Sequence, residues 1–380
     1  MTPQKIRIGV AGLGAVAQSV HLPLIQRRWD LFELAAVADL SAQNGAAVGD
    51  QFGVGPEHVY PTLGEMLDAE QLDGVVLLTS GSHGGPALEA LRHGVAVFCE
   101  KPLAFSLAEI DQLLEAEEAA GKPQLLLAYM KEYDPAVLAL RDRLPDASEI
   151  RYVNVEVLHP SGPSQLAFAN LHPAARDVDP AVIAELVAGD RAVIAHALGD
   201  EVAAARGDLY ANVVLGSLIH DISLVRALVG PIATVDDVNL WAEQDAPGSI
   251  EVSGTITENA RVHLHWHYMA DYPHYRETVT IHHTKGSLEL EFTVPYLLNA
   301  PTELRVVSKT ANGNSHELVS SVDEAFEAEL VAFHRMVTEG VKPPTRAEHG
   351  RLDVLTGQRI MSVLADKDGL TIGGEAARLS

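Results

Sequence analysis

A lysine stands where a short apolar run of the sequence ends, in residues 99–104, CEKPLA. The residues before it, VAVFC at 95–99, predict a buried strand. Proline cannot donate a hydrogen bond to a sheet, so Pro102 should place Lys101 at the carboxyl end of that strand. Ligands bind at that edge of an open parallel sheet. Lys101 is therefore a candidate for ligand contact, and the alternative is a lysine on a solvated turn.

A histidine within an apolar helical pattern is a second candidate. Residues 213–229, VVLGSLIHDISLVRALV, have the spacing of a helix, and His220 falls off its apolar stripe, one turn after Gly216. Asp221 points about 100° away from His220 and is not an automatic partner. The spacing leaves two interpretations open, which are a catalytic imidazole and a hydrogen-bonded core or surface residue.

A glycine-rich turn, GLGAVA at residues 12–17, lies between the first predicted strand and the first predicted helix. Glycines permit a tight turn and close approach to a pyrophosphate, which the helix N-terminus stabilises. Asp39, about 25 residues further on, could accept hydrogen bonds from an adenosine ribose. Leu40 and Ser41 offer no cation for a 2′-phosphate, so the pattern favours NAD over NADP. The alternative is that the glycines only allow the helix to pack on the strand.

Three histidines alternate in residues 263–267, HLHWH, on one face of a predicted strand. Imidazoles so spaced could bind zinc or copper. No carboxylate or cysteine accompanies them in the string, and Leu264 and Trp266 account for the strand through its opposite face. We therefore expect a polar sheet face or a subunit interface here, and no metal.

Predicted strands and helices alternate over the first 130 residues, which indicates right-handed βαβ units and a parallel, doubly wound sheet. The strands are expected at 6–12, 33–39, 73–79, 95–99 and 124–130, and the helices at 15–27, 86–94 and 106–121. Later strands follow one another without helices, which is typical of an antiparallel sheet. They are expected at 151–157, 249–258, 260–269, 277–283 and 286–292. Residues 159–192 are Pro-rich and irregular, with a helical piece near 180–188, and should leave the sheet and lie over the cleft.

Composition excludes several classes of protein. The 380 residues predict two domains, and 47% apolar with 21% charged residues indicates a packed chain. The net charge of −25 argues against binding to nucleic acid or to anionic membranes. Cys99, the only cysteine, fits a reducing compartment and should be a core residue. No run approaches about 18 uncharged apolar residues, so we expect a cytoplasmic protein.

The chain resembles the glucose-fructose oxidoreductase, inositol dehydrogenase and rhizopine-catabolism (Gfo/Idh/MocA) family over nearly its whole length. The resemblance rests on motifs in the family's order, of which EKP is the most specific. They are GLGAVA with Asp39, ALRHGVAVFCEKP (90–102), YMKEYDP (129–135), the helix around His220 and HTKGSLEL (283–290).

The resemblance implies an α/β fold. A Rossmann domain with a doubly wound parallel sheet is expected at 1–131. An α+β domain for substrate binding and oligomerisation, with a large, mostly antiparallel, open-faced sheet, is expected at 132–380. Helices at about 346–365 should pack back on the Rossmann domain.

The resemblance also implies NAD(P)-dependent hydride transfer to or from a sugar, a polyol or inositol, or a keto-sugar, in a homodimer or homotetramer. The implied catalytic residues are Lys101 and His220, and the bond before Pro102 should be cis. Implied cofactor-binding residues are Gly12, Leu13, Gly14, Ala15, Val16, Asp39, Thr79, Ser80, His83, Glu100 and Lys101. Implied substrate residues are Lys101, Tyr129, Lys131, His220 and Asp221.

Two positions depart from the family's pattern. Gly216 stands where members commonly have Asp, which removes a carboxylate partner of His220. Glu132 stands where members often have Arg, which changes the charge near the domain junction. The same scaffold supports two further functions, an NAD-dependent glycoside hydrolase and a non-catalytic NAD(P)-binding regulator. A regulator would have no need of Lys101 and His220 together.

Overall fold

The computed structural model describes residues 4–243, 247–257 and 260–379. Residues 1–3, 244–246, 258–259 and 380, which fall within the predicted domains and in one case within the strand predicted at 249–258, lie outside those ranges. The chain divides into two compact units, each with its own sheet. Unit 1 comprises Met1–Tyr129, Ala169–Ile194 and Phe326–Arg351, and unit 2 comprises Met130–Phe168, Ala195–Ala325 and Leu352–Ser380.

Unit 1 contains a six-stranded sheet in the order β3-β2-β1-β4-β5-β6, and every neighbouring pair is parallel. The strands are β1 (Ile6–Ala11), β2 (Phe32–Ala38), β3 (Val59–Tyr60), β4 (Gly74–Leu77), β5 (Ala96–Glu100) and β6 (Leu125–Ala128). All residues of β4, β5 and β6 are buried, as expected for parallel strands covered on both faces. The predicted doubly wound parallel sheet is confirmed.

Helices cover this sheet. They are η1 (Ala17–His21), α1 (Leu22–Arg27), α2 (Ala42–Gln51), η2 (Pro56–His58), α3 (Leu63–Ala69), α4 (Gly84–Arg92), α5 (Leu107–Ala120) and α11 (Ala325–Glu339). The helix predicted at 15–27 begins with a turn of π-helix, η1, before α1 continues it. In α5 a Ser106–Glu109 capping box begins the helix and Gly121 ends it.

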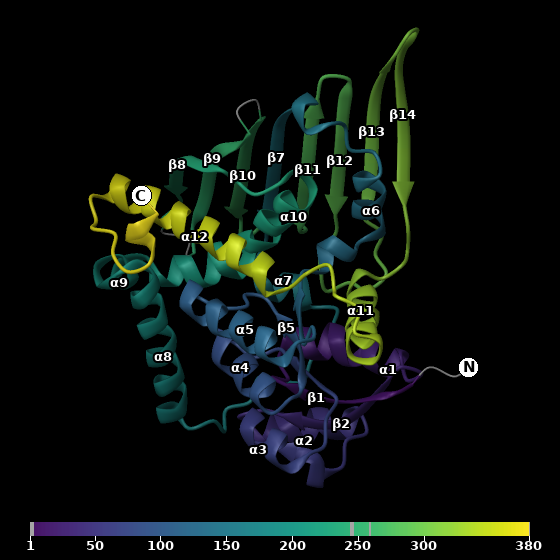
Figure 1. Ribbon diagram of the computed structural model, residues 1–380, viewed down its shortest axis with the longest axis vertical. Coiled ribbons are helices and arrows are strands. Elements are labelled where there is room, and N and C mark those ends of the chain that lie inside the picture. The colour runs from purple at the N-terminus through teal and green to yellow at the C-terminus, as the bar shows by residue number, and fades with distance from the viewer. Residues whose placement is uncertain (1–3, 244–246, 258–259, 380) are drawn as a thin grey trace. The chain divides into compact units, whose positions relative to one another are not determined.

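Unit 2 contains an eight-stranded sheet in the order β14-β13-β12-β11-β7-β10-β9-β8 (Figure 1). The strands are β7 (Ile150–His159), β8 (Thr234–Trp241), β9 (Ser249–Thr257), β10 (Ala260–Tyr268), β11 (Arg276–His283), β12 (Gly286–Phe292), β13 (Glu303–Thr310) and β14 (Gly313–Ser320). Every neighbouring pair is antiparallel except β7 with β10, which is parallel. The sheet is thus mostly antiparallel, and the parallel pair joins strands separated by a long, largely helical connection.

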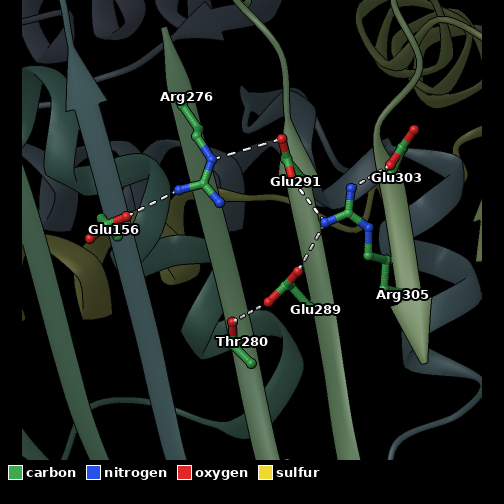
Figure 2. Close-up of polar contacts among 7 residues, drawn as sticks. All are labelled: Glu156, Arg276, Thr280, Glu289, Glu291, Glu303 and Arg305. Atoms are coloured by element: carbon green, nitrogen blue, oxygen red, sulfur yellow. Dashed lines mark hydrogen bonds and ion pairs between the residues drawn. The ribbon is translucent and has the colours of Figure 1, made fainter. Parts of the chain in front are cut away.

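The two faces of this sheet differ in chemistry. One face carries apolar side chains such as Val155, Leu264 and Val279, all buried. The other, here called the polar face, carries an ion-pair network that Figure 2 shows. Arg276 binds Glu156 and Glu291, and Arg305 binds Glu291 and also Glu289 and Glu303. Because strand residues alternate between faces, one sheet can be a core wall on one side and a charged surface on the other.

Further helices complete the chain. Two of them, α7 (Gly162–Leu166) and α8 (Pro180–Leu198), make residues 159–192 more regular than predicted. Unit 2 holds η3 (Met130–Tyr133), α6 (Pro135–Arg141), η4 (Ala147–Glu149), α7 (Gly162–Leu166), α9 (Asp200–Leu209), η5 (Tyr210–Leu218), α10 (Ile219–Val229) and η7 (Ala376–Arg378). Helices α8 (Pro180–Leu198) and α12 (Ala347–Asp368) contribute residues to both units.

One continuous helical stretch, Asp200–Val229, has the length and apolar composition of a membrane span. The sequence pattern did not single it out, because the stretch contains charged residues. Its most apolar window is 61% buried inside the fold, and buried core helices pass the same test.

Candidate functional site

The glycine-rich turn of unit 1 lies between β1 and η1. Gly12 has φ +90°, and a Cβ on it would lie 2.7 Å from backbone atoms of Leu78 and Thr79, so only glycine fits. Gly14 differs, because a Cβ there would meet no atom within 4 Å. The backbone at Gly14 therefore faces open space, which is what a pyrophosphate needs in order to reach a helix N-terminus.

Asp39 follows β2 and organises the same edge. Its Oδ2 accepts hydrogen bonds from the Leu13 N–H at 2.9 Å and from the Asn44 amide at 3.0 Å. Its Oδ1 accepts from the Ser41 N–H at 2.9 Å. These bonds hold the glycine-rich turn beside the start of α2. A carboxylate has about four acceptor positions, so one further donor can be accommodated.

Thr79 and Ser80 follow β4 at this edge. Among the described residues, the Thr79 hydroxyl is buried and has no hydrogen-bond partner, and Ser80 is exposed. An orphaned hydroxyl beside a glycine cradle suits a site that holds a polar ligand. The open space at Gly14, Asp39 and this hydroxyl together fit a dinucleotide.

Lys101 follows β5, and the Lys101–Pro102 bond is cis, as predicted. Glu100 fixes its neighbour, because Oε2 accepts the Lys101 N–H at 3.0 Å while Oε1 lies 2.9 Å from Nε2 of buried His21. Burial would raise the pKa of Glu100, but His21 and Lys101 outweigh burial and lower it. Glu100 is therefore ionised at neutral pH.

His83 joins the loop after β4 to the turn after β5. Its Nδ1 lies 2.7 Å from the Pro102 carbonyl and its Nε2 lies 2.8 Å from the Thr79 carbonyl. The ring is 1% exposed, and burial lowers its pKa although both carbonyls oppose this. His83 thus positions the loop of Thr79 and Ser80, and a contact of the ring with a cofactor stays a prediction.

Cys99, also in β5, is fully buried, and burial followed by the charge of Glu100 raises the pKa of its thiol well above the usual value. It is a core residue, as predicted. Tyr129 follows β6 and is also buried.

Lys131 in unit 2 lies between two carboxylates. Its Nζ lies 3.0 Å from Oδ1 of Asp221 and also binds Oε1 of Glu277. The other oxygen of Glu277, Oε2, accepts the Tyr275 hydroxyl at 2.6 Å. Lys131 is 6% exposed, and Asp221 and Glu277 are 1% exposed. Burial would lower the pKa of Lys131, but the two carboxylates outweigh burial and raise it.

Two carboxylates on one buried cation leave one negative charge in excess. Burial, which Lys131 opposes and Glu277 reinforces, raises the pKa of Asp221 to about 8. Burial and the two nearby carboxylates also raise the pKa of the Tyr275 phenol well above its usual value. At neutral pH Asp221 therefore holds a proton.

A second buried cation repeats this arrangement. Arg226 of α10 binds Oε1 of Glu132 at 2.7 Å and Oδ1 of Asp353 at 2.8 Å. Burial raises the pKa of Glu132 to about 7, against the opposing effect of Arg226. Glu132 of η3 thus meets an arginine from another helix.

His220 lies in the first turn of α10 and is half-buried. Its carbonyl accepts the Ser223 hydroxyl at 3.0 Å. The nine-residue π-helix η5 ends immediately before α10 and contains Gly216 and Ser217, whose hydroxyl accepts the Trp266 indole N–H at 2.8 Å. π-Helical turns are rare and frequent at functional sites. Asp221, the next residue, binds Lys131, so the expectation that it is no automatic partner of His220 agrees with its contacts.

The structure brings the predicted residues of unit 1 to one sheet edge, and in unit 2 it joins Lys131 to Asp221. Sequence reasoning missed the buried partners that shift the pKa values of Glu100, Lys131, Glu132 and Asp221 or bind the same ions. These partners are His21, Tyr275, Arg226, Glu277 and Asp353. Glu277 carried one usable signal, because it is an acidic residue on the apolar face of a predicted strand.

Comparisons with known proteins agree with this architecture. Residues 6–128 match the family described as "Oxidoreductase family, NAD-binding Rossmann fold" (GFO_IDH_MocA). An inositol 2-dehydrogenase of Saccharopolyspora erythraea is 33% identical over 146 residues, which cover 38% of this chain and 42% of that protein. One of Leifsonia xyli is 31% identical over 165 residues, which cover 43% and 48%. The chain thus spans less than half the length of these curated relatives.

Solved structures extend the likeness over both units. A 3-ketoreductase mutant from Actinomadura kijaniata, in complex with TDP-benzene and NADP, matches with a TM-score of 0.70 at 16% identity, covering 94% of this chain and 98% of that one. An aldose-aldose oxidoreductase from Caulobacter crescentus has a TM-score of 0.69 at 19% identity, with coverages of 96% and 98%. At these identities the likeness shows the fold.

Proposed function

We propose that the chain belongs to the Gfo/Idh/MocA oxidoreductase family, whose model matches residues 6–128, and that it transfers a hydride between a nicotinamide cofactor and a CH–OH carbon of a carbohydrate. The substrate class is a sugar, a polyol or inositol, or a keto-sugar. Residues 1–131 hold the cofactor, and residues 132–380 bind the substrate. The observation that carries the proposal is the open space at Gly14 beside Asp39, in the turn that follows β1.

We assign the cofactor as NAD. Gly12–Val16 receive the pyrophosphate, Asp39 receives the adenosine ribose, and Thr79, Ser80 and His83 form the wall after β4. Asp39 would repel a 2′-phosphate, and Leu40 and Ser41 carry no cation to attract one. When bound, the nicotinamide accepts or supplies the hydride.

Lys101 hydrogen-bonds the reacting oxygen of the substrate in this proposal. An ammonium with the ordinary pKa of about 10.4 stays charged at neutral pH. It stabilises the negative charge that develops on that oxygen when hydride leaves the adjacent carbon. Glu100 keeps the Lys101 backbone in place through its 3.0 Å hydrogen bond.

His220 accepts the hydroxyl proton during oxidation and returns it during reduction. Its place directly after the π-helix η5 supports this role, since π-helical turns are frequent at functional sites. Tyr129, Lys131 and Asp221 are the further proposed substrate residues. Lys131 and Asp221 bind each other in the structure. In this proposal they therefore affect the substrate indirectly, because their ion pair fixes the start of α10, which carries His220.

The protein is proposed to work in the cytoplasm as a homodimer or homotetramer on small-molecule carbohydrates. The names of the relatives support the small-molecule substrate and the composition of the chain supports the cytoplasm, whereas the oligomer rests on the family resemblance alone.

A substrate screen tests the proposal. Sugars, inositols and keto-sugars are supplied with NAD and with NADP, and reduced nicotinamide is followed by its absorbance, with His220→Gln as the inactive reference. Net formation or consumption of NADH that His220→Gln lacks supports the oxidoreductase. Glycoside cleavage that needs NAD but forms no net NADH indicates the hydrolase instead. NAD binding without turnover of any of these compounds indicates a regulator.

A further inference from the structure

Three side chains on the polar face of the unit 2 sheet have no part in the proposed reaction. His265 and His267 alternate along β10, and Glu251 lies directly opposite His265 on β9. One possible ligand atom of each lies within 4.8 Å of the other two. The carboxylate missing from the sequence string HLHWH is thus supplied by the neighbouring strand.

These groups differ from the charged residues beside them. In the network of Figure 2, each carboxylate binds an arginine. Glu251, in contrast, makes no hydrogen bond or ion pair with any described residue. The buried Nδ1 of His267 also has no partner within the described ranges, and its ring lies 5.3 Å from the Trp241 ring. An unpaired carboxylate beside an imidazole nitrogen without a partner is an arrangement that a cation would satisfy.

We propose that Glu251, His265 and His267 bind a Zn²⁺ ion on the polar face of this sheet. Two imidazoles and one carboxylate form a recognised zinc donor set that leaves an open position. Zinc bonds of about 2.0–2.2 Å place tetrahedral ligands about 3.4 Å apart, so small side-chain rotations close the present spacing. Magnesium and calcium prefer oxygen ligands and do not fit two imidazoles.

A zinc titration tests this site. The full chain is stripped with a chelator and titrated with Zn²⁺ in competition with a chromophoric chelator. We expect one saturable site, weakened at least about tenfold in Glu251→Gln, His265→Gln and His267→Gln. The matched control is His263→Gln, a histidine of the same strand and face outside the cluster, which should stay within about twofold. No saturable binding, unchanged affinity in Glu251→Gln, or an equal loss in His263→Gln overturns the proposal.

A different observation concerns residues 169–179, here called the strap, which belong to unit 1. Asp177 of the strap accepts the Ser41 hydroxyl on Oδ1 and the Gln43 N–H on Oδ2 at 2.9 Å. The His172 N–H donates to Gln18, whose own amide donates to the Leu13 carbonyl. The strap therefore contacts both the helix that follows the glycine-rich turn and the first turn of α2.

The two hydrogen-bond donors that Asp177 occupies, the Ser41 hydroxyl and the Gln43 N–H, bear on the choice between NAD and NADP. Ser41 caps α2 two residues after Asp39, the proposed ribose acceptor. A 2′-phosphate on that ribose would require the same donors, namely a hydroxyl and the N–H groups of a helix N-terminus. Although Asp177 is exposed, hydrogen bonds from Ser41 and Gln43 hold its pKa below the usual value and keep it charged.

We infer that Asp177 takes the place of a 2′-phosphate and thereby selects NAD over NADP. The inference rests on the proposed cofactor site. It assigns specificity to a carboxylate that lies 138 residues after Asp39 in the chain, in addition to Asp39 itself. Excluding a competitor with a fixed like charge is a general route to specificity.

Direct titration of NAD and NADP, followed by nucleotide fluorescence, tests Asp177 without any substrate. We expect Asp177→Ala to bind NADP about tenfold more tightly than wild type and NAD within about threefold. The matched control is Asp179→Asn. Asp179 lies two residues after Asp177, its carboxylate accepts the Ala181 N–H at the start of α8, and its replacement should change neither affinity. Unchanged NADP affinity in Asp177→Ala, with NAD still bound, overturns this inference alone. A wild-type chain that binds neither nucleotide overturns the proposed function as well.

Discussion

Glu100 shows how one residue can serve both fold and site. Its side chain is 7% exposed and divides its two oxygens between buried His21 and the backbone of Lys101. An ionised carboxylate held in this way is fixed on both sides, so the start of the turn after β5 has little freedom. The Lys101 side chain therefore begins from a defined point, which a positioned acid–base group requires.

Replacement of Lys101 tests its proposed role. We expect Lys101→Met to lower kcat by about 10²–10⁴, the range for a positioned acid–base group, because no charge then stabilises the substrate oxygen. NAD affinity should stay nearly unchanged, since the Gly12–Val16 turn and Asp39 hold the cofactor. Lys101→Arg should be nearly as slow, because a planar fork cannot place a compact charge at the same point. Steady-state kinetics and NAD titration measure both effects, and near-normal turnover of Lys101→Met would return the residue to a solvated turn.

At the scale of elements, two buried cations tie the helical parts of unit 2 together. Lys131 of η3 binds α10 through Asp221 and β11 through Glu277. Arg226 of α10 binds η3 through Glu132 and α12 through Asp353. Helix α10, which carries His220, is thus held at its first and last turns by charged side chains from other elements.

Removal of one of these cations should be costly. Lys131→Met leaves the side chains of Asp221 and Glu277 buried without their cation, and we expect the free energy of unfolding to fall by about 3–5 kcal/mol. The control is Lys285→Met, which removes a lysine that is 68% exposed and pairs with Glu149 on the surface. That change should cost at most about 1 kcal/mol. Chemical denaturation measures both, and equal losses would show that burial of the Lys131 cluster has no special weight.

Sequence patterns predicted elements well where burial dictates them. The five strands predicted in unit 1 begin and end close to their predicted bounds, because apolar runs such as β4 and β5 are buried throughout, whereas the two-residue strand β3 was not predicted. Strand β14 was not predicted, since almost all of its residues are exposed and pairing with β13 rather than an apolar pattern stabilises it. The ion pair of Lys131 with Glu277 joins residues 146 positions apart. Such contacts depend on tertiary packing, which no local pattern encodes.

At the scale of the whole molecule, charge is distributed unevenly between surface and interior. The chain carries a formal charge of −25, and most acidic residues lie where water solvates them. A few carboxyls are instead buried, and burial raises the pKa values of two of them, Glu132 and Asp221, to about 7 and about 8. Buried acids must be protonated or paired, and the raised pKa values of Glu132 and Asp221 make the stability of the fold sensitive to pH near neutrality.

The sign of that sensitivity follows from the raised pKa values. Between the unfolded pKa of about 4 and the folded values, the folded chain holds protons that the unfolded chain releases. Each of the two groups therefore contributes stability that is full below about pH 4 and is lost as the pH rises through its folded pKa, with a slope of about 1.4 kcal/mol per pH unit. We expect the melting temperature to fall as the pH rises from about 5 to about 8. The double variant Glu132→Gln with Asp221→Asn should fall less steeply, because each amide keeps the shape of the protonated acid and cannot ionise. Thermal unfolding over this pH range compares the two proteins, with exposed Glu57→Gln as the control, and parallel curves for wild type and the double variant would contradict the assignment.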